Sequence, residues 1–189
     1  MVTRLDERRS KTRTWNALKM KEEIVNRVAK SSLITIDLEE YYPEEPRTLL
    51  DVKNWLFEGL ILKENEFRAE LKNFDWLQLR NHHVALHCST DAIIPAWAYM
   101  LIQTHLKDVA KTVVVGSLDN LESFIYKSIV DNLDLDFCKN KPIIVKGCAN
   151  KPIPQNAYLM LIQKLQPLAK SIMYGEACSS VPLYKKKKI

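Results

Sequence analysis

Cysteines are the residues of this 189-residue sequence whose type is best suited to chemistry. Cys88, Cys148 and Cys178 each follow a short apolar run that is typical of a strand, whereas Cys138 lies in a linker. Thiolates are preferred ligands of zinc, copper(I) and iron–sulfur clusters. Ligands of open parallel sheets bind beyond the carboxyl ends of the strands, so we expect the three thiols to converge there. With Asp91 as a fourth ligand, they predict a site for zinc or an iron–sulfur cluster.

Other assignments of these residues stay open. His87, Glu176 or Asp119 could supply the fourth ligand in place of Asp91. Cys88 or Cys148 could instead be the nucleophile of a thiol enzyme, although His87 should point away from Cys88 because adjacent strand residues face opposite sides. A third possibility is a structural or interaction module in which the cysteines are small buried residues. Alkylation distinguishes the last two, because only a low-pKa thiol reacts rapidly near neutral pH.

Composition and charge exclude several classes of protein. The chain has only four glycines and neither of the phosphate-binding glycine motifs, so we expect no nucleotide cofactor. The net charge of +5 comes from residues 1–19 and from four lysines at 185–188, on a slightly acidic body, which argues against nucleic-acid binding. No run of 18 apolar residues and no secretory signal is present, so we expect no membrane association and a cytoplasmic protein with reduced thiols.

An internal repeat indicates which elements would position the cysteines. Residues 94–116 and 153–175 align without gaps and share 8 of 23 positions, and the strands just upstream align at the same offset. Each copy has the pattern strand, helix opened near a proline, strand, glycine. The continuous apolar strands HVALHC, KTVVVG, PIIVKG and KSIMYG are typical of a parallel sheet that is covered on both faces. The repeat therefore predicts an α/β fold with a duplicated βαβ unit in one four-stranded parallel sheet, with a connecting helix over 117–133.

The remaining sequence divides around this core. We expect a helix near 21–32, a strand over 33–38 and a helix over 63–74 in the N-terminal portion. The predicted organisation is a disordered basic leader (1–20), an α+β portion packed on the core (21–81), the duplicated core (82–184) and a basic tail (185–189).

Several long strings carry a resemblance to a known family. They are EIVNRVAKSSLITIDLEEYY, DVKNWLFEGLILKENEFR, CSTDAIIPAWAYMLI, KGC and GEACSSVPLYK, within about residues 22–185. Together they resemble an uncharacterised bacterial family, the domain of unknown function 2480. The resemblance implies a small cytoplasmic protein that begins near Met20, with Cys88, Cys148 and Cys178 but not Cys138 in its motifs. It also implies a gene near those of iron–sulfur assembly. We therefore expect an accessory protein of iron–sulfur assembly or thiol metal handling, with assembly proteins as partners. The oligomeric state is not predicted.

Overall fold

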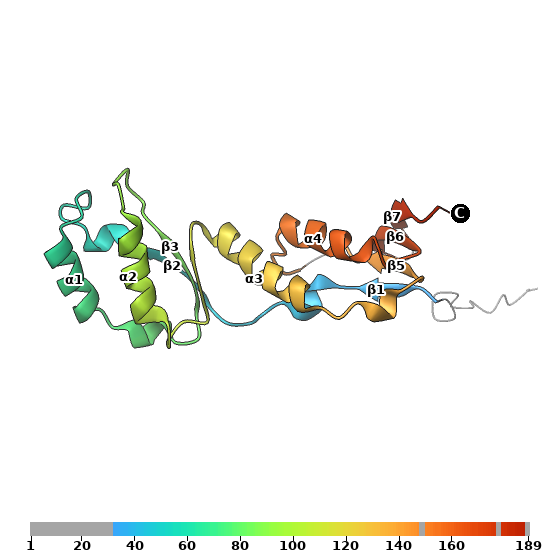
Figure 1. Cartoon of the computed structure of the whole chain (residues 1–189), viewed down its shortest axis with the longest axis horizontal. Helices are drawn as coiled ribbons and strands as arrows, with labels where there is room; N and C mark the ends of the chain where they lie inside the picture. Colours follow the sequence, from blue (N-terminus) through green and yellow to red (C-terminus); the bar gives the residue numbers. More distant parts are fainter. Residues whose placement is uncertain (1–31, 148–149, 177–178, 188–189) are drawn as a thin grey trace, which may run out of the picture. The chain divides into compact units, whose positions relative to one another are not determined.

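The computed structural model describes residues 32–147, 150–176 and 179–187 of the chain (Figure 1). The described strands are β1 (Ile34–Ile36), β2 (Arg47–Asp51), β3 (His83–His87), β4 (Thr112–Val115), β5 (Pro142–Val145), β6 (Ser171–Glu176) and β7 (Ser179–Lys185). The described α-helices are α1 (Glu64–Asn73), α2 (Ala96–Leu106), α3 (Leu118–Asn132) and α4 (Gln155–Leu165). Short 3₁₀ segments lie at Leu38–Tyr41, Val52–Trp55, Trp76–Leu79 and Asp136–Cys138. The predicted leader and the helix near 21–32 fall outside the described residues, apart from Ser32.

The strands form two sheets. One has the order β1-β5-β6-β7, with β1, β5 and β6 parallel and β7 antiparallel. The other has the order β2-β3-β4 and is parallel throughout. The mixed α/β class is confirmed, but the prediction that β3, β4, β5 and β6 share one sheet is wrong. The four strands are divided between two sheets, in which the N-terminal strand β2 pairs with β3 and the N-terminal strand β1 pairs with β5.

Each sheet contains two neighbouring parallel strands that are joined through a helix. These segments are β3–α2–β4 and β5–α4–β6, and α2 and α4 begin 59 residues apart. Pro95 and Pro154 directly precede the two helices, where a missing backbone N–H costs little. Gly116 ends the first segment with a φ of 139°, a conformation that disfavours other residues.

The three-stranded sheet is covered by helices on both faces. Alternate residues of β3 point to opposite sides, as the two-residue period of a strand requires. Val84 and Leu86 pack in a core with α1 and α2, which include Phe67 and Ile102. Ala85 packs instead in a core with α3. Figure 1 shows α1 and α2 lying beside each other near β2 and β3.

Helix α3 also belongs to the core of the four-stranded sheet. Its residues Tyr126 and Val130 pack with β5 and with α4, which contributes Leu161 and other buried leucines. The hydroxyl of Tyr126 is fully buried and donates a hydrogen bond to the carbonyl oxygen of Leu38 (3.2 Å). Thus one helix supplies side chains to the cores of both sheets. Within the described ranges, no helix is long and apolar enough to cross a membrane.

Candidate functional site

The carboxyl ends of β5 and β6 lead to two of the predicted metal ligands. These strands are parallel neighbours, so their carboxyl ends lie at the same edge of the four-stranded sheet. Gly147 directly precedes Cys148, and Glu176 at the end of β6 stands two positions before Cys178. Cys148 and Cys178 themselves lie outside the described residues. The structure therefore describes the strands that lead to these thiols but leaves their predicted approach untested.

Cys88 follows a strand of the other sheet. It comes directly after β3, which pairs with β2 and β4 and not with β5 or β6. The prediction that all three cysteines follow strands of one sheet is therefore wrong for Cys88. Asp91, the predicted fourth ligand, is exposed in the loop after Cys88. Among the residues that the structure describes, no group of three or more His, Cys, Asp or Glu side chains could hold a metal ion.

Cys138 has the environment of a core residue. It is fully buried in the segment that leads into β5, at the amino end of that strand. Burial raises the pKa of its thiol, and the positive charge of Lys141 only partly opposes this. Cys138 therefore has the properties of an inert packing residue.

The half-buried Cys88 sulfur lies beside hydroxyl groups. Its Sγ is 3.3 Å from Oγ1 of Thr90, which itself donates a hydrogen bond to the carbonyl oxygen of Gly59 (2.9 Å). Burial raises the pKa of Tyr99, and the nearby Cys88 raises it further. Because the one Thr90 proton goes to Gly59, Thr90 Oγ1 is placed to accept a hydrogen bond from the Cys88 thiol.

Asp51 and His87 form a second polar pair near Cys88. They are register partners at the carboxyl ends of β2 and β3, with 3.9 Å between Asp51 Oδ2 and His87 Nε2. The backbone N–H groups of Ser89 and Lys53 donate to Asp51 Oδ1 at 3.1 and 3.0 Å. Burial would raise the pKa of Asp51, but these hydrogen bonds outweigh it and lower the pKa. Asp51 is therefore held as a carboxylate next to the loop that carries Cys88.

Polar residues also gather at the carboxyl edge of the four-stranded sheet. Asp37 follows β1 and accepts a hydrogen bond from Lys146 Nζ (2.5 Å), which follows β5. The Tyr174 hydroxyl on β6 donates to the carbonyl oxygen of Gly147 (3.3 Å). A Cβ atom at Gly147 would lie only 2.7 Å from the Tyr174 ring, so the two residues are closely packed. Sequence analysis missed this group, although Asp37 and Lys146 each stand near the carboxyl end of a predicted strand.

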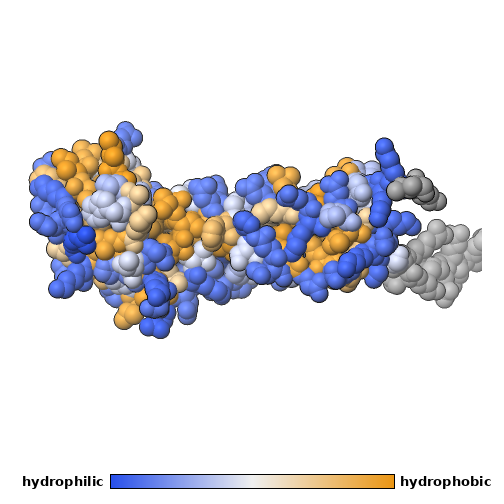
Figure 2. Space-filling model, in the orientation of Figure 1, coloured by the Kyte–Doolittle hydropathy of each residue, from blue (hydrophilic) through white to orange (hydrophobic). Residues whose placement is uncertain are grey.

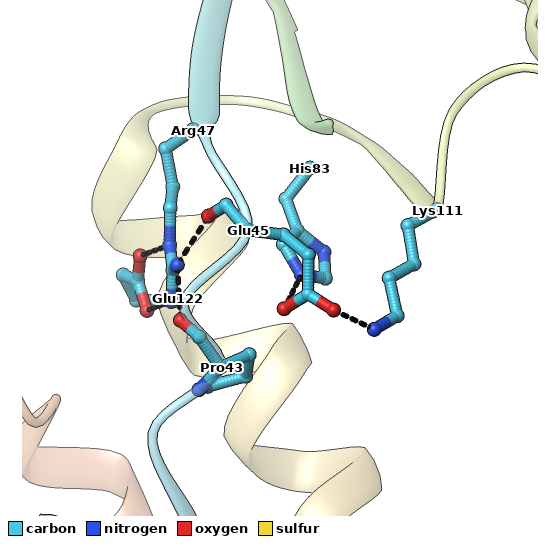
Figure 3. Close-up of polar contacts among 6 residues, drawn as sticks. All are labelled: Pro43, Glu45, Arg47, His83, Lys111 and Glu122. Atoms are coloured by element: carbon cyan, nitrogen blue, oxygen red, sulfur yellow. Dashed lines mark hydrogen bonds and ion pairs between the residues drawn. The ribbon is translucent and has the colours of Figure 1, made fainter. Parts of the chain in front are cut away.

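A charged cluster lies at the amino edge of the three-stranded sheet, opposite the edge of that sheet from which Cys88 follows (Figure 3). Arg47 begins β2 and donates to Glu122 on α3 (2.6 Å) and to the carbonyl oxygens of Pro43 and Glu45 (2.5 and 2.6 Å). Burial would lower the pKa of Arg47, but the hydrogen bond to Glu122 outweighs it and raises the pKa. The Glu45 carboxylate lies between Lys111, which donates a hydrogen bond to it, and His83. The bond from Lys111 lowers the pKa of Glu45 to about 2.

His83 is the buried member of this cluster. Its side chain is 4% exposed, and neither ring nitrogen has a hydrogen-bond partner among the described residues. Its Nε2 is 3.7 Å from Glu45 Oε2, a distance suited to an ion pair only if the imidazole is protonated. Burial lowers the pKa of His83, and the positive charge of Arg47 lowers it further. The arrangement therefore favours the neutral imidazole.

Comparison with known proteins gives one match. The family model described as "Protein of unknown function (DUF2480)" matches residues 22–186, which include all the described strands and helices. No curated protein and no solved structure matches the chain.

Proposed function

This chain belongs to the DUF2480 family, and from the strands that lead to its cysteines we propose that it is a cytoplasmic accessory protein that binds a metal ion or an iron–sulfur cluster through Cys148 and Cys178. The observation that carries the proposal is the parallel pairing of β5 and β6. Neighbouring strands lie about 4.8 Å apart, so residues just beyond their carboxyl ends can approach within the spacing of two sulfurs on one metal.

The residues before the two thiols support this arrangement. Tyr174 of β6 packs against Gly147 and donates a hydrogen bond to its carbonyl oxygen, directly before Cys148. The end of β5 is thereby bound to the strand that leads to Cys178. Lys146 lies at the same edge, where its ammonium group pairs with Asp37.

An accessory role follows from the number of thiols at this edge. Two thiolates fill half of a tetrahedral zinc or iron site. Since Cys88 follows a strand of the other sheet, the remaining ligands would come from Glu176 and from a partner such as an iron–sulfur assembly protein. Sites with ligands from two proteins suit transfer of a metal or cluster, rather than its permanent storage.

The test is the metal content and visible absorption of protein purified without oxygen, with and without iron and sulfide reconstitution. Cys148→Ser and Cys178→Ser should each abolish bound metal and its absorption, because a single thiolate cannot retain it. Cys138→Ser is the matched control and should retain the metal, provided that its fold is intact by circular dichroism. Cys88→Ser should also retain it, whereas loss would restore the three-thiol site. A wild-type protein that binds neither iron nor zinc would contradict the proposal.

A second candidate function is a thiol enzyme that uses Cys88 as its nucleophile. The free, partly exposed thiol of Cys88 favours this possibility, since it lies at the carboxyl edge of the sheet that also carries Asp51 and His87. Its test is the rate of alkylation by iodoacetamide near neutral pH, followed by mass mapping. Rapid modification of Cys88 would support an activated thiol, whereas a rate no faster than that of a free cysteine would contradict it.

We also propose that β3–α2–β4 and β5–α4–β6 are two copies of one duplicated βαβ unit. The shared offset of 59 residues between their helices and the sequence identities within 94–116 and 153–175 support this origin. The thiols after β3 and β5 would then occupy equivalent loops of the two copies.

A further inference from the structure

Strand β4, which is four residues long, has a free edge that lacks the charges, proline and bulge that protect other sheet edges. Among the described strands it pairs only with β3, in a regular register. Its sequence TVVV contains no charge and no proline, and Val115 is 57% exposed. The other described edges differ, since β2 carries Arg47 and Asp51, β7 contains Pro182 beside a register shift, and β1 has three residues. Charges, proline, bulges and short length all discourage pairing with another strand.

An apolar groove of about 380 Å³ lies beside this edge. It is lined by Leu86, Tyr99, Met100, Gln103 and residues 113–115. Met100 on α2 is 66% exposed although it is a large hydrophobic residue. The part of the molecule that holds α2 and the three-stranded sheet also carries hydrophobic surface in Figure 2. The free edge therefore has an apolar border that an added strand could cover.

The same chain contains an occupied edge of this kind. The segment β5–α4–β6 has the same order as β3–α2–β4, and β6 begins 59 residues after β4. The side of β6 away from β5 pairs with the antiparallel strand β7, from Ser171 opposite Lys185 to Glu176 opposite Ser179. The corresponding side of β4, away from β3, is the free edge. A strand–helix–strand segment of this form thus accepts an antiparallel strand on that side.

We propose that β4 pairs antiparallel with β4 of a second copy of this chain, so that two three-stranded sheets join into one of six strands. The strand is self-complementary in this orientation. Val114 of one copy lies opposite Val114 of the other, and Val113 lies opposite Val115, so that opposite residues share a face of the sheet. Cross-strand pairs of β-branched residues stabilise antiparallel strands.

Charge selects the antiparallel orientation. Lys111 directly precedes β4 and is exposed, although it pairs with Glu45 of its own chain, and the exposed Asp119 lies after β4 on α3. Antiparallel pairing places Lys111 of each copy toward the end that carries Asp119 of the other, whereas parallel pairing would bring the two lysines together. A two-fold contact also uses the same surface on both copies and closes as a dimer. Pairing of β4 with β7 of another copy would instead leave free edges for further addition.

The experiment measures the mass of the full chain in solution by sedimentation over a wide concentration range. The wild type should approach twice the 21.9 kDa mass of one chain. Val115→Lys places two like charges at the joined edge and should weaken association by about a hundredfold or more. Met100→Lys, on the helix that borders the groove, should weaken it as well without altering β4 itself.

Val181→Lys is the matched control. It places the same charge at a similarly exposed valine (60%) on β7, and should leave the dimer intact. Circular dichroism establishes that each variant is folded. A wild type that stays monomeric at every concentration would overturn the proposal. So would a Val115→Lys or Met100→Lys variant that remains fully dimeric, or a Val181→Lys variant that dissociates.

Discussion

His83 makes the stability of the fold depend on pH in a defined range. Burial and the charges of Arg47 and Lys111 lower its pKa below 6.5, while Glu45 only partly opposes them. In the unfolded chain, His83 has its ordinary pKa and binds a proton near pH 6.5. The unfolded state therefore binds more protons than the folded state between pH 6.5 and the lower folded pKa. The free energy of unfolding should be at its full value above pH 6.5 and fall as the pH decreases below it.

Replacement of His83 by leucine should remove this part of the pH dependence. Urea unfolding from pH 8 to about pH 5 should show a smaller decrease in unfolding free energy for His83→Leu than for the wild type. His82→Gln is the control, because His82 is only half-buried and its Nδ1 lies 2.8 Å from the Thr48 hydroxyl. Glu45 titrates in a separate range, since its stabilising effect is present above pH 4.5 and is lost toward pH 2. Equal pH profiles for His83→Leu and the wild type would contradict the prediction.

The charged cluster could not be predicted from local sequence because its partners are distant along the chain. Lys111 is 66 residues from Glu45, and Glu122 is 75 residues from Arg47. Such pairs depend on which strands become neighbours. By contrast, the polar residues Asp37 and Lys146 stand near the carboxyl ends of predicted strands, so their position at a strand end could have been predicted. The thiols Cys148 and Cys178 were identified by the same strand-end argument, and their approach stays a prediction.

Among the elements, α3 begins with a capping box that should contribute measurably to stability. The Ser117 hydroxyl accepts a hydrogen bond from the backbone N–H of Asn120, and the Asn120 side chain accepts one from the N–H of Ser117. Ser117→Ala removes the first bond and should lower the free energy of unfolding by about 1 kcal/mol in urea titrations. Ser128→Ala, at an exposed position inside the same helix, should change it by less than about 0.5 kcal/mol. An equal effect of both substitutions would show that the cap is not the cause.

Elements with strong local signals were predicted within about one residue at each end. The helix expected over 63–74 spans Glu64–Asn73, and that expected over 117–133 spans Leu118–Asn132. Their apolar spacing and, for α3, the cap are encoded within the helix itself. Strand β7 was missed because Pro182 lies within it. Proline removes a donor from the ladder and is tolerated here because β7 is an edge strand.

At the scale of the whole molecule, strand partners were the part that could not be predicted. The strands β3 to β6 are short runs rich in Val and Ile, and these apolar surfaces pack equally well beside many neighbours. The repeat therefore indicated the strand–helix–strand segments but not the sheets to which they belong. Strands β1 and β2 complete two separate sheets, because β1 pairs with β5 of one segment and β2 pairs with β3 of the other.

The two sheets should nevertheless unfold together, because α3 contributes to the cores of both. Its Leu121 and Ile125 pack with Ala85 of the three-stranded sheet, while its Tyr126 and Val130 pack in the core of the four-stranded sheet. All three tryptophans among the described residues (Trp55, Trp76 and Trp97) pack beside the three-stranded sheet. In a Trp15→Phe background, fluorescence therefore reports that sheet alone, whereas far-ultraviolet circular dichroism reports both. The two urea transitions should coincide.

Substitution of the shared helix should separate these transitions. Leu121→Ala removes about 2–5 kcal/mol of packing where α3 meets the three-stranded sheet, so the fluorescence transition should move to lower urea than the circular dichroism transition. Leu106→Ala is the matched control, because Leu106 is equally buried but lies on α2, in the core of one sheet only. Its loss should shift both transitions together, because the intact α3 still couples the sheets. If Leu121→Ala also shifts both transitions equally, α3 is not the element that couples them.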